Sequence, residues 1–177
     1  YSTTELESSR DTLVLLYPKW IPGYHGPTGP IGNVAGFIVK DPAGSPVQWV
    51  RDWSNPFRFL VFDAGNHQKV SVNLTYCDGL PTLGVINWNT VTVYPEGESV
   101  ADIRVQTRLL LPSGWRYATA MPTKEIRGDT VIFESVSYEE LIDYPLICGV
   151  YLNTYEVATT PSAKYFIHVA VDDETLL

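Results

Sequence analysis

The sequence predicts an all-β fold: a two-sheet antiparallel β-sandwich of about ten strands with one short helix. Two observations carry this prediction. Hydrophobic and polar residues alternate along several short segments, as they do in strands that bury one face. The 177-residue chain also contains 13 Gly and 13 Pro, which are spread throughout, so it turns often. Two packed antiparallel sheets bury such strands on their inner faces.

The clearest expected strand is Lys69–Tyr76, in which Val70, Val72 and Leu74 alternate with polar residues. Segments 103–111 and 165–171 show the same alternation. Seven shorter or more apolar runs, separated by turn-forming residues, complete the set of ten expected strands: 12–17, 36–40, 47–51, 57–62, 87–94, 130–134 and 152–158.

One short helix is expected near residues 137–143. Ser137 and Glu140 have the spacing of a capping box, in which each side chain accepts a hydrogen bond from the other residue's backbone N–H. Pro145 then prevents the helix from continuing. About two turns fit between these signals.

Length and composition predict one globular domain over residues 1–177. Hydrophobic residues make up 45% and charged residues 18% of the chain, which argues against disorder. A chain of this size can bury about 70% of its surface, which is enough for a full hydrophobic core without disulfide bonds or structural metal ions. Because Tyr1 rather than Met comes first, we expect a mature or excised product, from which any signal peptide has been removed.

The net charge of −8 excludes several partners. An acidic surface repels phosphate, so nucleic acid is not an expected partner. No polybasic run is present to attract an anionic membrane. The longest apolar runs, such as 13–17, are far shorter than the ~20 residues that a membrane-spanning helix needs.

Catalytic motifs are missing from the sequence. His25, His67 and His168 lie far apart and none belongs to an HExxH pair; we expect His168 to be an ordinary half-buried strand histidine. No GxSxG elbow is present. Glu139 and Glu140 are unsuited to act as a carboxylate pair, because adjacent helical side chains diverge by about 100° and Glu140 has a capping role.

The two cysteines, Cys77 and Cys148, make no metal motif. One disulfide between them is possible, but nothing in the sequence indicates it. A buried free thiol is the more common state of such a cysteine, and the pairing stays open.

Residues 17–30 have the most unusual composition in the chain. Four Pro and three Gly surround Trp20, Tyr24 and His25 in this segment, which we call the proline loop. Proline fixes φ and removes a hydrogen-bond donor, so the proline loop cannot pair as a central strand. We expect a rigid, aromatic surface loop. It either seals one end of the sandwich or presents a preformed binding surface to a ligand or another domain.

The proline loop and the seven residues after it, YPKWIPGYHGPTGPIGNVAGF, resemble the N-terminal segment of the glycyl aminopeptidase family of zinc metallopeptidases (peptidase family M sixty-one). Two later segments resemble the same family in the expected order. Residues 109–120, LLLPSGWRYATA, are similar to its LPxGWxxATA strand and turn. Residues 138–149, YEELIDYPLICG, are similar to its ELVDSPVxxG segment.

The resemblance implies a β-rich N-terminal domain that precedes a thermolysin-like catalytic domain and a PDZ-like domain. In that family an HExxH motif and a downstream Glu bind zinc, and all of them lie in the catalytic domain. The chain stops about where that domain is expected to begin. The resemblance therefore implies no catalytic residue, no metal ligand and no cofactor in this chain, with zinc in the absent domain.

What the resemblance does imply is an accessory role. The N-terminal domain packs on the catalytic domain of the same polypeptide and helps to wall the cleft for the peptide substrate. The expected interdomain and cleft-facing residues come from the proline loop and from the segment around the short helix, where Tyr144 departs from the family's Ser: Pro18, Trp20, Ile21, Pro22, Gly23, Tyr24, His25, Tyr138, Asp143, Tyr144 and Pro145.

A second hypothesis is a free-standing binding module for carbohydrate or peptide, with Trp20, Tyr24 and Trp115 as stacking platforms. Exposure separates the two hypotheses. A planar row of exposed aromatics favours sugar binding, whereas a broad apolar patch around the proline loop favours a missing domain. Bacterial members of the resembled family commonly carry export signals, so we expect a periplasmic or secreted location.

Overall fold

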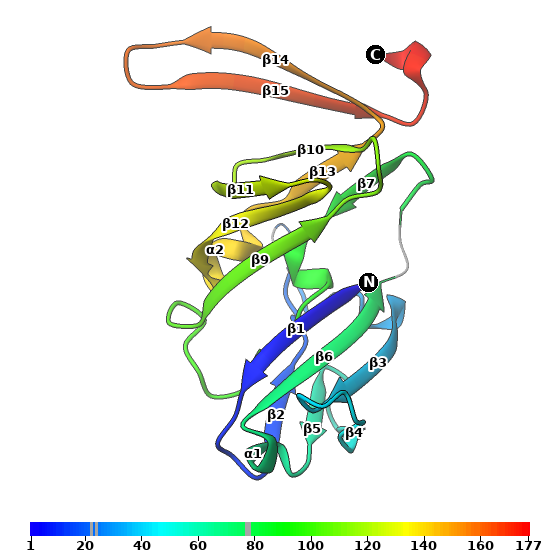
Figure 1. Cartoon of the computed structure of the whole chain (residues 1–177), viewed down its shortest axis with the longest axis vertical. Coiled ribbons are helices and arrows are strands. Elements are labelled where there is room, and N and C mark those ends of the chain that lie inside the picture. Colours follow the sequence, from blue (N-terminus) through cyan, green and yellow to red (C-terminus); the bar gives the residue numbers. More distant parts are fainter. Residues whose placement is uncertain (22, 24, 77–78) are drawn as a thin grey trace. The chain divides into compact units, whose positions relative to one another are not determined.

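The computed structural model describes residues 1–21, 23, 25–76 and 79–177. The sheets are antiparallel throughout the described residues, which confirms the predicted all-β class. The chain forms two compact units (Figure 1). Unit 1 consists of residues 1–78 and 88–99, and unit 2 of residues 79–87 and 100–177. The single domain expected over residues 1–177 stays a prediction that unfolding experiments can test.

Unit 1 contains two sheets, with strand orders β1–β6–β3 and β4–β5–β2–β8. In Figure 1 the long strand β6 lies between β1 and β3. Short helical turns connect some of these strands. The elements are β1 Ser2–Glu7, β2 Leu13–Leu16, η1 Ile31–Asn33, β3 Val34–Lys40, β4 Trp49–Arg51, β5 Arg58–Val61, α1 Ala64–His67, β6 Lys69–Tyr76, η2 Trp88–Thr90 and β8 Tyr94–Pro95.

The core of unit 1 receives side chains from both of its sheets. Val70, Val72 and Leu74 of β6 are each 1% exposed, as the alternation in the sequence predicts. Phe37 of β3 stacks on Phe59 of β5 with ring centroids 4.1 Å apart and planes 7° apart. Each such buried side chain stabilises the fold by roughly 1.5–3 kcal/mol relative to an exposed one. The two sheets therefore share one apolar core, the arrangement of a sandwich.

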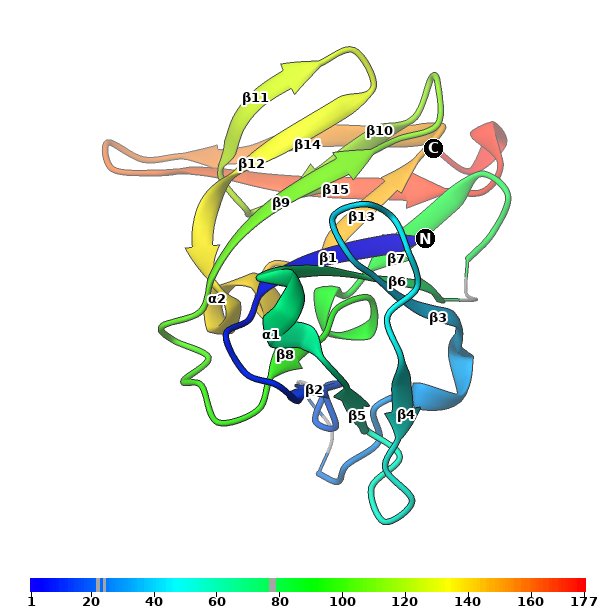
Figure 2. The same cartoon turned by 60° about the horizontal axis from the view of Figure 1, so that its bottom comes forward.

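Unit 2 contains two three-stranded sheets, β10–β13–β7 and β11–β12–β9, and the hairpin β14–β15. Figure 2 shows this hairpin as a long two-stranded ribbon. The elements are β7 Leu83–Ile86, β9 Arg104–Leu110, β10 Arg116–Thr119, β11 Thr123–Arg127, β12 Thr130–Ser137, α2 Tyr138–Ile142, β13 Leu146–Gly149, β14 Tyr151–Thr159, β15 Lys164–Val171 and η3 Glu174–Leu176.

The helix expected near 137–143 is present as α2, flanked by Ser137 at its N-cap and Asp143 at its C-cap. The backbone N–H of Glu140 donates to Ser137 Oγ at 3.1 Å, and the backbone N–H of Ser137 donates to Glu140 Oε2 at 2.8 Å. This last bond stabilises the charged carboxylate, which lowers the pKa of Glu140. The capping box predicted from the sequence is therefore confirmed.

Three details of the predicted fold are wrong. The described residues form fifteen strands in five hydrogen-bonded sheets rather than about ten strands in two, because several short strands match no expected segment: β1, β7, β10, β11 and β13. A one-turn helix, α1, has no counterpart in the prediction. Segment 87–94 is not a strand: Trp88, Asn89 and Thr90 are all buried and form the 3₁₀ turn η2. Continuous burial without alternation does not distinguish a strand from a turn.

Candidate functional site

The proline loop leaves the sheet of unit 1 from a firmly anchored residue, Tyr17. The side chain of Tyr17 is 1% exposed, and its hydroxyl donates to the carbonyl of Thr90 at 2.9 Å. Burial raises the pKa of Tyr17 well above its ordinary value of 10, so the phenol stays neutral. Pro18 is also buried. The first two residues of the loop are thus held in place by the core.

The two arms of the proline loop meet at Gly29. Its backbone N–H donates to the carbonyl of Lys19 at 2.8 Å. A Cβ atom at Gly29 would lie only 2.2 Å from the carbonyl oxygen of Pro18 and 3.1 Å from the ring of Phe57, so no other residue fits without movement. The composition of the loop therefore has a steric cause here: glycine allows its ends to close on each other.

The outer part of the proline loop is presented to solvent. Trp20 is 61% exposed, Ile21 is half-buried, and Gly23 and His25 are exposed. Gly23 has φ +88°, a conformation that favours glycine. Pro22 and Tyr24, the remaining predicted site residues of this loop, lie outside the described residues. The exposed Trp20 fits a surface that binds a ligand or another domain better than a loop that only seals the core.

A second loop of unit 1, residues 52–57 between β4 and β5, contacts the proline loop through Phe57. The backbone N–H of Tyr17 donates to the carbonyl of Phe57 at 2.8 Å, and the two rings stack with centroids 6.5 Å apart. The ammonium group of Lys19 lies 5.7 Å from the centre of the Phe57 ring. Trp53, the second residue of this loop, is fully exposed.

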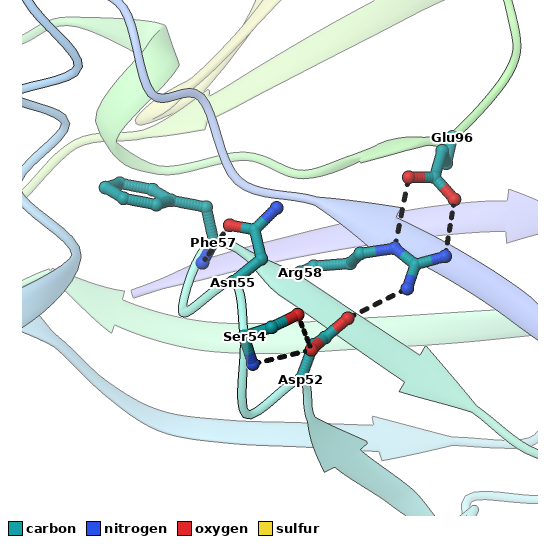
Figure 3. A network of polar contacts seen from close by, with 6 residues as sticks. All are labelled: Asp52, Ser54, Asn55, Phe57, Arg58 and Glu96. Atoms are coloured by element: carbon teal, nitrogen blue, oxygen red, sulfur yellow. Dashed lines mark hydrogen bonds and ion pairs between the residues drawn. The ribbon is translucent and has the colours of Figure 1, made fainter.

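Arg58 holds the 52–57 loop in a fixed conformation (Figure 3). Its guanidinium donates to Glu96 Oε1 and Oε2 at 3.0 and 2.8 Å, and to Asp52 Oδ2 at 2.8 Å. The other carboxylate oxygen of Asp52 accepts from the backbone N–H and the hydroxyl of Ser54, both at 2.8 Å. The exposed Trp53 therefore lies between braced neighbours and is preorganised.

The electrostatics of this network follow from its hydrogen bonds. Donation from the Arg58 guanidinium, and then from Ser54, lowers the pKa of Asp52 from 3.8 to about 2. The same bonds to Glu96 and Asp52 raise the pKa of Arg58, which stays charged at every accessible pH. Asp52 and Arg58 are therefore both charged at neutral pH.

Trp53 and its brace are not among the site residues predicted from the sequence. A local signal was available, because Trp53 stands among the turn-forming residues Asp52, Ser54, Asn55 and Pro56, where an aromatic side chain has little chance of reaching a core. No local pattern in the sequence indicates that Glu96, the distant partner of Arg58, belongs to this brace. We call the exposed aromatics Trp20 and Trp53, with the Phe57 contact that connects their loops, the two-loop surface.

The other predicted site residues belong to unit 2. Tyr138, the first residue of α2, is buried, and its backbone N–H donates to the carbonyl of Ile103 at 2.8 Å. Asp143 and Pro145 are exposed and Tyr144 is half-buried. The carbonyl of Pro145 accepts from the Thr119 hydroxyl at 3.0 Å. Of these four, only Asp143 and Pro145 are exposed.

The remaining candidates for chemistry form no catalytic cluster in the described part of the chain. His168 is exposed rather than half-buried as expected, with Nδ1 2.9 Å from Thr154 Oγ1, because both faces of β15 are exposed over residues 164–168. His67 Nδ1 lies 3.8 Å from Asp41 Oδ2. Outside positions 22, 24, 77 and 78, no three His, Cys, Asp or Glu side chains gather where a metal ion could bind.

Cys148 is a free, buried thiol. Its sulfur donates to the carbonyl of Gly84 at 3.6 Å, and burial raises the pKa of the thiol. A protonated, buried thiol is a poor nucleophile. Cys77 lies outside the described residues. Among the helices of the described segments, none is long and apolar enough to cross a membrane.

Trp115, the third aromatic of the binding-module hypothesis, is half-buried in unit 2. A Cβ atom at Gly84 would lie 3.7 Å from its ring, so the indole packs against β7. Trp115 therefore offers less of its ring to a ligand than Trp20 or Trp53 does.

Comparison with known proteins gives the family. The family described as Peptidase M61 N-terminal domain matches residues 2–150, and no curated protein matches the chain. Among solved structures, an aminopeptidase N family protein from Idiomarina loihiensis shares the fold, with a TM-score of 0.78 and 22% identity. The similarity covers 94% of this chain but only 29% of that one. The resemblance found in the sequence is confirmed: the chain belongs to the Peptidase M61 N-terminal domain family.

Proposed function

We propose that this chain is the non-catalytic accessory domain of a zinc-dependent aminopeptidase of the glycyl aminopeptidase type. The observation that carries the proposal is the family match over residues 2–150. The structural relative, described as an aminopeptidase N family protein, supports it, because this fold makes up 29% of that longer chain. In the proposed enzyme a thermolysin-like catalytic domain, followed by a PDZ-like domain, completes the polypeptide.

Under this proposal, the residues of this chain do not bind the zinc ion. The described residues offer no group of three ligand side chains, so no step of the reaction is assigned to them. The metal and the general base belong to the catalytic domain. This chain's own task is to bind that domain and to shape the entrance for the peptide.

The two-loop surface is the proposed contact with the catalytic domain and with the peptide cleft. Trp20 is exposed on a loop that Tyr17 and Gly29 hold in shape, and Trp53 is exposed on a loop that Arg58 braces. A rigid aromatic side chain binds with little loss of conformational entropy. Exposed aromatics on prebuilt loops are therefore suited to wall a cleft.

Steady-state kinetics of the longer polypeptide test this role. Because Trp20 would contact the substrate side of the cleft without touching the reacting atoms, Trp20→Ser should raise KM for peptides severalfold and leave kcat nearly unchanged. Leu110→Ser is the matched control, since Leu110 is 74% exposed, belongs to unit 2 and is not among the predicted site residues. Unchanged kinetics for Trp20→Ser, together with unchanged hydrogen exchange of the proline loop on removal of the catalytic domain, would contradict the proposal.

The binding-module hypothesis is the second candidate, and the full exposure of Trp53 beside Trp20's loop favours it. Titration of the isolated chain with soluble oligosaccharides, followed by tryptophan fluorescence, separates the two. The accessory-domain proposal predicts no saturable change. A saturable change that Trp53→Ala abolishes would favour the binding module instead.

We also propose a periplasmic or secreted location, on the basis of the family alone. Protease treatment of intact and of permeabilised producing cells tests it. Cleavage in cells whose outer barrier alone is opened is expected, and protection until lysis would contradict it.

A further inference from the structure

The β14–β15 hairpin of unit 2 has two chemically different faces. In the antiparallel register Tyr155 is opposite Ile167, and Tyr165 lies two positions from Ile167, so these three side chains share one face. They are 47%, 53% and 52% exposed. A hairpin normally buries such a face, because two strands alone are marginally stable in water.

The opposite face is polar along the same stretch. Thr154 and His168 are paired there by a hydrogen bond of 2.9 Å, and Glu156 contacts Lys164 at 3.7 Å. Phe166 lies on this face, where its ring stacks with that of His168 at 6.4 Å. This alternation is typical of a strand pair that has one solvated face and one face packed against other residues.

The apolar face is left uncovered in unit 2. Near its base the hairpin packs on the unit through Leu152, which is 3% exposed and lies on the Thr154–His168 face, so this packing does not cover Tyr155 and Ile167. Figures 1 and 2 show the ribbon continuing past that base toward its tip. In the strand register, Tyr155, Ile167 and Tyr165 lie between Leu152 and the turn that joins the two strands. An exposed cluster of this kind marks an interaction surface.

Three observations indicate what covers the face. The family match ends at residue 150, and β14 begins at Tyr151, so the hairpin lies beyond the part that defines the N-terminal domain family. The structural relative covers 94% of this chain, which must include part of the hairpin, and has a remainder more than twice the length of the shared fold. Segment 151–171 carries one Glu and one Lys and is neutral, whereas a second copy of the chain would bring another −8 charge.

We propose that the apolar face formed by Tyr155, Tyr165 and Ile167 docks on the catalytic domain of the same polypeptide. This inference rests on the proposed function, which supplies that domain. The hairpin is then a second docking element, distinct from the two-loop surface of unit 1. Its polar face, with Thr154 and His168, stays in water.

Thiol labelling tests the docking. Ile167→Cys places a thiol on the apolar face, and His168→Cys places one on the polar face one residue further along the same strand. Both positions are exposed in this chain, so neither substitution disturbs the core. Each variant is labelled in the isolated chain and in the longer polypeptide, and the modified peptide is quantified by mass.

We expect the labelling rate of Ile167→Cys to be at least ~10-fold lower in the longer polypeptide than in the isolated chain. In the docked state the thiol can react only when the contact transiently opens. The rate for His168→Cys should be the same in both. Equal rates for Ile167→Cys would overturn the proposal, as would protection of both faces. Protection of Ile167→Cys in the isolated chain that grows with its concentration would overturn it too, because it would show a second copy as the occupant.

Failure of the proposed function is distinguishable from failure of this inference. If the longer polypeptide shows one-sided protection but no zinc-dependent aminopeptidase activity, the hairpin contact stands and the enzyme assignment falls. If the longer polypeptide is active but Ile167→Cys is not protected, the enzyme assignment is supported and the hairpin contact is contradicted. Tyr165→Cys, on the same apolar face, provides an independent second variant.

Discussion

The guanidinium of Arg58 donates two parallel hydrogen bonds, of 3.0 and 2.8 Å, to the carboxylate of Glu96, which lies 38 residues later in the sequence. The contact joins the first residue of β5 to the residue immediately after β8, and Arg58 also reaches Asp52 in the loop before it. A planar guanidinium can satisfy both carboxylates at once, which a lysine cannot do. This one side chain therefore fixes the loop that presents Trp53.

Replacement of Arg58 by lysine should loosen the 52–57 loop. A single ammonium group cannot pair in the bidentate manner with Glu96 while it also bonds Asp52, so the loop loses part of its bracing. We expect a lower melting temperature and faster hydrogen exchange of the Ser54 amide. Arg108→Lys, at an exposed position in unit 2, is the control. An unchanged Ser54 amide in Arg58→Lys would show that the brace is not needed.

The stability of the brace should depend on pH in an unusually acidic range. The pKa of Asp52 is about 2 in the folded chain and 3.8 ordinarily, so the unfolded state binds the proton more readily. The contribution of Asp52 is then complete above pH 3.8 and disappears as the pH falls through about 2. Denaturant unfolding across this acidic range should show this loss in the wild type and not in Asp52→Asn. An Asp52 carboxyl that titrates near 3.8 by NMR would contradict the assignment.

Gly29→Ala should disrupt the proline loop, whereas Gly32→Ala should not. The added Cβ meets the Pro18 carbonyl at 2.2 Å in the first case and nothing within 4 Å in the second. Forced overpacking costs about 1–3 kcal/mol of unfolding free energy, while a compatible Gly→Ala change is neutral or stabilising by about 0.4–1 kcal/mol. Equilibrium unfolding of the two variants measures the difference. Equal stabilities would mean that the loop closes without contact at Gly29.

The single domain predicted from the length requires that the two units unfold together. Phe59 in unit 1 and Phe133 in unit 2 are both 0% exposed, and truncation of either to Ala should cost about 3–5 kcal/mol. In a cooperative domain Phe59→Ala accelerates global hydrogen exchange in β12 as well as in β6. Exchange that changes only in β6 would show instead that unit 1 unfolds independently.

Local patterns predicted much of the fold, and long-range contacts explain the rest. Strand β6 has the bounds 69–76 that its alternation indicated, and the Ser137–Glu140 capping box formed as expected, because both depend on neighbouring residues. The turn at Trp88–Thr90 was misread as a strand, since three consecutive buried residues have no period.

The candidate site was predicted only in part. The proline loop was found from its composition, and Trp20 is exposed there as a binding surface requires. The contribution of Trp53 depends on the Arg58–Glu96 pair, which no spacing rule reveals. The sequence likewise predicted a β15 strand whose face includes Tyr165 and Ile167, but it could not show that this face stays uncovered in unit 2.

The proposed accessory role requires that the chain support catalysis without performing it. The most direct measurement is the release of an N-terminal glycine from a peptide by the purified 177-residue chain and by the longer polypeptide, each with added zinc and each with a chelator. We predict release only by the longer polypeptide, and only with the metal. Release by the 177-residue chain that zinc supports and the chelator abolishes would contradict the account.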